Sequence, residues 1–110
     1  MSFPIQITHH GLEPSGGIDT LIREEASKLE KFFDGIVSCR VLIERPDGHH
    51  QSGAPYHLRL NLVVPGADLA VVGEPSVDAA TMVRETFRRA RRRLQEYARR
   101  RAETHLRSGR

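Results

Sequence analysis

Arginines gather near the end of this chain, and their side-chain chemistry suits the binding of phosphate. Eleven arginines and three glutamates lie between Arg84 and Arg110, a formal charge of +8. Residues 1–83 carry six basic and eleven acidic residues, a formal charge of −5. A guanidinium group donates two parallel hydrogen bonds to a phosphate and is weakly hydrated. This division of charge indicates a polyanionic partner. A solvated, arginine-rich helix face is the alternative that charge alone leaves open.

The arginines lie on a predicted helix from Val77 to Arg101. Its apolar residues are spaced three and four apart, which predicts one continuous stripe on an α-helix. They are Ala80, Val83, Phe87, Ala90, Leu94 and Tyr97. Ser76 is the candidate N-cap, although Ala79 stands where a capping box would have an acid. Phe87 is taken as the centre of the stripe, and the arginines are placed at about 100° per residue. One flank then holds Arg88, Arg92 and Arg99, and the other holds Arg89, Arg93 and Arg100. Arg84 and Arg91 lie at the edge of the stripe.

The elements before this helix predict a sheet that supports it. Alternating apolar residues indicate strands at 3–8, 36–45, 56–64 and 69–72, and a one-sided apolar pattern indicates a helix at 18–33. The second strand has Val37, Cys39, Val41 and Ile43 facing inward, and residues 46–55 form a hairpin connection. The fold class is α+β with the order β-α-β-β-β-α. Both helices pack on one face of the four-stranded sheet, as in double-stranded-RNA-binding domains.

The sequence offers little support for metal binding, thiol chemistry or nucleotide binding. The pairs His9–His10 and His49–His50 are predicted in loops without an accompanying metal-ligand motif, so no metal is expected. Cys39 is the single cysteine and falls at an inward position, where a thiol is unreactive. Phosphate-binding loops of the Walker type are missing from the sequence. We therefore predict a protein that is not an enzyme and has no cofactor and no small-molecule substrate.

Length and composition predict one domain. Residues 1–103 are expected to form a single α+β domain, and residues 104–110 a disordered tail. The sequence has neither an apolar run of the ~20 residues that cross a bilayer nor a secretory signal pattern. A lone cysteine fits a reducing compartment. A cytoplasmic protein without a membrane partner is expected.

Several stretches together resemble one known family. These are residues 5–8, 22–34, 38–41, 56–60, 64–66, 78–80 and 87–94, which read IQIT, IREEASKLEKFFD, SCRV, YHLRL, VPG, DAA and FRRARRRL. In order and spacing the chain resembles the short forms of the ribosome hibernation promoting factors. These are also called ribosome-associated translation inhibitors or sigma-54 modulation proteins. Because the sequence stops soon after the second predicted helix, we expect a short form without the C-terminal dimerisation domain of the long forms.

The resemblance implies a function in the bacterial stress response and stationary phase. It implies that the protein binds ribosomal RNA of the small (30S) subunit in the channel of messenger and transfer RNA, and so inhibits translation. Carried over by position, the RNA-binding residues are Lys28, Lys31, Arg84, Arg88, Arg89, Arg91, Arg92 and Arg93. The alternative is a protein-interaction module whose basic helix docks an acidic partner such as a sigma factor.

Overall fold

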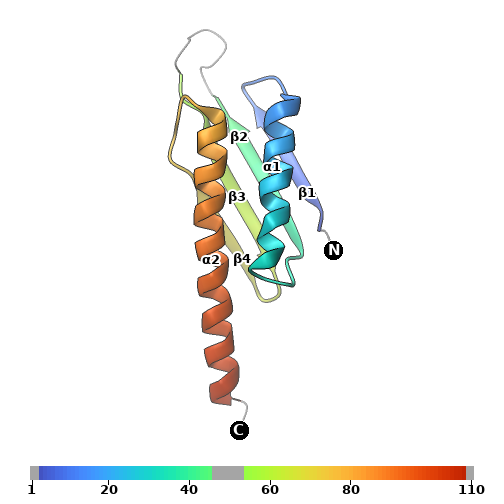
Figure 1. Cartoon of the computed structure of the whole chain (residues 1–110), viewed down its shortest axis with the longest axis vertical. Coiled ribbons are helices and arrows are strands. Elements are labelled where there is room, and N and C mark those ends of the chain that lie inside the picture. The colour runs from blue at the N-terminus through green and yellow to red at the C-terminus, as the bar shows by residue number, and fades with distance from the viewer. Residues whose placement is uncertain (1–2, 46–53, 109–110) are drawn as a thin grey trace.

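The computed structural model of the chain describes residues 3–45 and 54–108, which form an α+β fold (Figure 1). The elements are β1 (Ile5–His10), α1 (Gly16–Lys28), the 3-10 turn η1 (Leu29–Lys31), β2 (Ser38–Glu44), β3 (His57–Val64), β4 (Ala67–Val72) and α2 (Ala79–Ser108). The predicted order β-α-β-β-β-α is confirmed. Most of the hairpin connection predicted at 46–55 lies outside the described residues.

The four strands form one sheet in the order β1-β2-β3-β4. β1 runs parallel to β2, and the other two pairs are antiparallel. Both helices lie against the same face of this sheet, with α1 beside α2 (Figure 1). The alternation along β3 explains this packing, because Leu58, Leu60 and Leu62 are at most 2% exposed on the covered face. The predicted one-sided packing of the helices is confirmed.

Two details of the predicted strands are wrong. Val37 was expected inward with Cys39, but it is 53% exposed, while Ile36 is buried. The reason is that β2 begins only at Ser38, so its pleat does not include Val37. β1 extends to His10, which places His9 and His10 in a strand instead of a loop.

The two strand histidines each face a carboxylate rather than a cluster of metal ligands. His9 Nε2 lies 2.8 Å from Asp19 Oδ1, and His10 Nδ1 lies 3.2 Å from Glu44 Oε2. The parallel pairing of β1 with β2 brings His10 opposite Glu44. Among residues 3–45 and 54–108, no group of three or more His, Cys, Asp or Glu side chains could hold a metal ion. His49 and His50 lie outside the described residues.

α2 begins two residues later than the sequence predicts, and Asp78 is its N-cap. The Thr81 amide donates to Asp78 Oδ1 at 3.1 Å, and the Met82 amide donates to the Asp78 carbonyl at 3.0 Å. Ser76, the predicted cap, instead accepts from the Asp78 amide at 3.0 Å. The hydrogen bonds from Thr81 hold the pKa of the Asp78 carboxyl below its usual value. The ionised carboxylate is therefore the form that stabilises the helix start.

Replacing Asp78 with alanine is expected to lower the melting temperature at neutral pH. Because the folded-state pKa is depressed, the contribution is present above the unfolded pKa and is lost as the pH falls through the folded pKa. The difference in melting temperature between wild type and Asp78→Ala should therefore shrink in acid. Thermal unfolding measured at several pH values tests this, with Asp78→Asn as the control, since asparagine still caps but does not titrate. A difference that stays constant down to strongly acidic pH would contradict the cap.

α2 also ends later than predicted. It continues through Ser108, whereas the sequence predicts its end at Arg101. Tyr97 Oη and Arg101 Nη1 both donate to the Pro65 carbonyl in the β3–β4 turn, the latter at 2.8 Å. Arg99 also pairs with Glu103 one helical turn onward, at 2.8 Å. These contacts, and the strong helix propensity of alanine, arginine and glutamate, account for the added turns.

No helix among the described residues is long and apolar enough to cross a bilayer.

Candidate nucleic-acid interface

A groove between α1 and α2 gathers most of the cations that the sequence predicts for binding. It has a volume of about 440 Å³. Its lining residues are Glu25, Lys28, Leu29, Lys31, Phe32, Arg84, Phe87, Arg88 and Arg91. Five of these nine side chains are cationic and one is acidic. Positive charge in a concave site is focused there and attracts anions more strongly than the same charge on a convex surface.

Helical spacing and the shared sheet face explain why these cations meet. Arg84, Arg88 and Arg91 follow one another at intervals of four and three, so they lie along one side of α2. Lys28 ends α1 and Lys31 ends η1, and both helices pack on the same side of the sheet. The groove therefore has one cationic wall from each helix.

The acidic residues near the groove neutralise it only in part. Lys28 Nζ lies 3.1 Å from Glu25 Oε2, and Arg88 Nη1 lies 2.9 Å from Glu85 Oε2. Both are exposed pairs between neighbouring helix turns, which contribute little energy and exchange readily. In the described part of the chain, Lys31 and Arg84 have no ion-pair partner within 4.0 Å. The groove thus keeps cations that are available for an anion.

Arg91 is arranged differently from the other groove cations. Its guanidinium carbon lies 4.9 Å from the centre of the Phe32 ring. A guanidinium stacked on an aromatic face is attracted to it, while its edge stays free to donate hydrogen bonds. The sequence predicts Arg91 partly against the sheet, but its side chain is exposed. The sequence did not predict Phe32 as a lining residue of the groove. The available signal was the adjacent pair Phe32 and Phe33 at the end of the predicted helix, because neighbouring side chains on a helix point about 100° apart.

The remaining predicted residues, Arg89, Arg92 and Arg93, lie farther round α2 and do not line the groove, although the sequence places Arg92 on one flank with Arg88. They line a second depression of about 430 Å³ together with Gln95 and Glu96. The structure therefore does not bring the eight predicted residues into one site. Five of them form the groove, and three form a separate surface.

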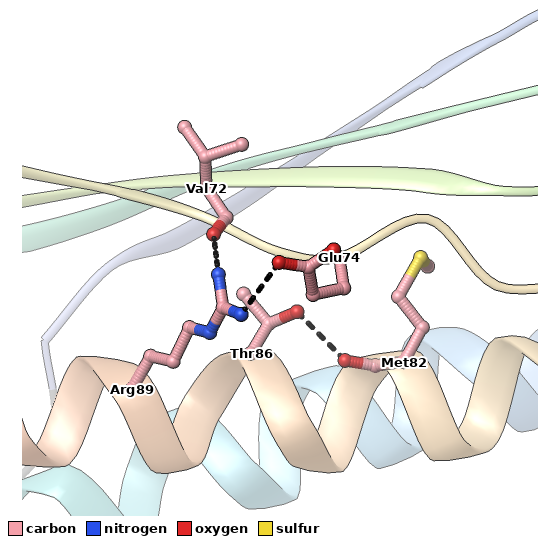
Figure 2. A network of polar contacts seen from close by, with 5 residues as sticks. All are labelled: Val72, Glu74, Met82, Thr86 and Arg89. Carbon is pink, nitrogen blue, oxygen red and sulfur yellow. Dashed lines mark hydrogen bonds and ion pairs between the residues drawn. The ribbon is translucent and has the colours of Figure 1, made fainter.

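Arg89 is engaged by the protein itself. Its Nη1 donates to the Val72 carbonyl at 2.8 Å, and its Nη2 donates to Glu74 Oε2 at 3.0 Å (Figure 2). Val72 is the last residue of β4, and Glu74 belongs to the segment that leads from β4 to α2. The side chain is still 43% exposed. Arg89 therefore ties α2 to the edge of the sheet, whereas Arg92 and Arg93 make no such contact among the described residues.

The fold is also found in solved structures. The protein Y N-terminal domain of Thermus thermophilus is 14% identical, with a TM-score of 0.72 over 86% of this chain and 99% of that one. A ribosomal subunit interface protein from Coxiella burnetii is 17% identical, with a TM-score of 0.70 over 87% of this chain and 98% of that one. At such identities the likeness shows the fold alone. No curated protein matches this chain.

The sequence matches a family model over almost its whole length. The family is described as "Sigma 54 modulation protein / S30EA ribosomal protein", and the match covers residues 5–102. This range contains every element from β1 to β4, both walls of the groove and most of α2. The resemblance seen in the sequence is confirmed: the chain belongs to the sigma-54 modulation protein and S30EA ribosomal protein family.

Proposed function

We propose that this protein is a non-enzymatic translation inhibitor that binds ribosomal RNA of the small subunit in the channel of messenger and transfer RNA. In this proposal residues 1–103 act as one ribosome-binding domain in the cytoplasm, during stress or stationary phase. The groove between α1 and α2 carries the proposal, because five cations line it and face outward. Membership of a family of ribosome-associated proteins supports it.

The composition of the groove favours recognition of the RNA backbone. Lysine and arginine bind phosphate oxygens, which position a protein on RNA without reading its sequence. Phe32, the aromatic ring at the surface of the groove, is half-buried and has Arg91 over it. Single-strand binders instead use several aromatic platforms along a basic channel. We therefore propose that the ligand is folded RNA of fixed shape, whose phosphates match the two walls of the groove.

Binding to isolated small subunits should depend steeply on salt. If each of the five groove cations contacts one phosphate, counterion release gives a slope of about −4.5 for the logarithm of the association constant against the logarithm of salt concentration. Co-sedimentation through sucrose gradients at a series of salt concentrations measures this slope. Large subunits serve as the control. Failure to co-sediment with small subunits at low salt, or equal binding to both subunits, would reject the proposed site of action.

The alternative function is docking of an acidic protein partner such as a sigma factor. The family description, which names sigma 54 modulation, is the observation in its favour. The two functions differ in their need for RNA. Capture of partners from lysate before and after nuclease treatment separates them: partners lost with the RNA support ribosome binding, and a retained acidic protein supports docking.

A further inference from the structure

The face of the sheet that the helices leave uncovered carries a second group of cations. A depression of about 440 Å³ lies over its middle strands. The side chains on this face that line it are Gln6, Thr8, Arg40, Leu42, Arg59 and Asn61. This surface is on the opposite side of the sheet from the groove between α1 and α2, because side chains alternate between the two faces.

Arg40 and Arg59 are diagonal neighbours on this face. Arg40 of β2 stands opposite Asn61 of β3, and Arg59 stands opposite Leu42. Diagonal positions on adjacent strands are about 7–8 Å apart, within reach for long side chains. Both arginines are exposed. Two positive charges on neighbouring positions repel each other. An anion between them therefore lowers the electrostatic free energy of this face.

The carboxylates on this face do not supply that anion. Glu44 is diagonal to Arg59 on its other side, but its Oε2 lies 3.2 Å from His10 Nδ1. Asp68 is on β4, two strands away from Arg40. Within residues 3–45 and 54–108, neither Arg40 nor Arg59 has a carboxylate oxygen within 4.0 Å. The two guanidinium groups are therefore open to an external ligand.

We propose that the uncovered face of the sheet is a second anion-binding surface, in which Arg40 and Arg59 bind phosphates of an RNA backbone. The arginine forks supply bidentate contacts, and Gln6, Thr8 and Asn61 add uncharged hydrogen-bonding groups beside them. None of the residues lining this depression is aromatic, so the surface suits phosphate and sugar rather than stacked bases. The domain then lies between two RNA segments, one on the helices and one on the sheet. This inference rests on the proposed binding to the small subunit.

The first test compares two variants that each lose two positive charges. Arg40→Gln with Arg59→Gln should weaken binding to small subunits by about a hundredfold, because two hydrogen-bonded contacts to charged groups are lost. Its salt slope should be shallower by about 1.8, the value for two lost phosphate contacts. Arg99→Gln with Arg100→Gln is the matched control, because these arginines pair with Glu103 and Glu96 at the far end of α2. A sheet variant whose affinity and slope equal those of wild type, or of the control, overturns the proposal.

The second test locates RNA on each face by crosslinking. Burial raises the pKa of the Cys39 thiol to about 12, so a photo-crosslinker reacts selectively with a new surface cysteine. Thr8→Cys marks the sheet face and Glu25→Cys marks the groove between α1 and α2. Crosslinks from Thr8→Cys to ribosomal RNA support the second surface. Crosslinks to RNA from Glu25→Cys alone overturn it while leaving the proposed function intact, and none from either position overturns both. Crosslinks from Thr8→Cys to a ribosomal protein replace RNA with a protein partner and also overturn it.

Discussion

Reversing the charge of Arg84 and Arg88 together is expected to weaken binding to small ribosomal subunits by about a hundredfold or more. Both side chains line the groove between α1 and α2. A hydrogen bond to a charged group contributes about 1.5–3 kcal/mol, and two such losses correspond to at least two orders of magnitude in affinity. The new carboxylates would add repulsion against phosphate. Sedimentation or fluorescence titration at fixed salt measures the change.

The fold should survive this double substitution. Arg84 and Arg88 are both exposed, and the pair of Arg88 with Glu85 is a surface pair, so the free energy of unfolding should change by less than about 1 kcal/mol. Arg99→Glu with Arg100→Glu is the charge-matched control on the same helix. An equal loss of affinity in both variants would mean that binding follows total charge, and would contradict a specific role for the groove.

Replacing Gly73 with alanine is expected to destabilise the protein by about 3 kcal/mol, as overpacking of a tight core does. An added Cβ at this position would overlap Thr86 Oγ1 and would come within 3.3 Å of its Cγ2. Neither the backbone at Gly73 nor the side chain of Thr86 can move easily to relieve this overlap. Thr86 is fully buried, and its hydroxyl donates to the Met82 carbonyl at 2.7 Å, as Figure 2 shows. The Gly73 amide donates to the Leu58 carbonyl at 2.9 Å. Urea unfolding at equilibrium measures the loss.

A double-mutant cycle identifies the clash as the cause. Thr86→Ala removes both the hydroxyl and the methyl group that the new Cβ would meet, so Gly73→Ala with Thr86→Ala should recover about 1–2 kcal/mol of the loss. Gly17→Ala is the matched control, since a Cβ there meets nothing within 4 Å and lies in α1. It should be neutral or stabilise by up to about 1 kcal/mol. Equal destabilisation by both glycine substitutions would show that close packing of β4 against α2 is not the reason.

The sequence alone determined the elements and the face of the sheet that they cover. Apolar alternation in β3 and the three-four spacing in α2 depend on local geometry, which the backbone period sets directly. The division of charge along the chain follows directly from the number of charged residues in each part of the sequence. Ends of elements were less well predicted. Single hydrogen bonds that several nearby residues could make decide the choice of Asp78 over Ser76 as N-cap and the extension of α2 past Arg101.

Only the tertiary structure decided which arginines share a site. On an isolated helix the arginine rows of α2 are chemically equivalent. Packing of α1 against one side of α2 makes Arg84, Arg88 and Arg91 part of a groove. On the other side, Val72 of β4 and Glu74 after it accept hydrogen bonds from Arg89. The partners of these side chains are distant in the sequence, for example Phe32 for Arg91 and Glu74 for Arg89. Periodicity places a residue on a face of its own element, but the neighbour that it meets is set by how the elements pack.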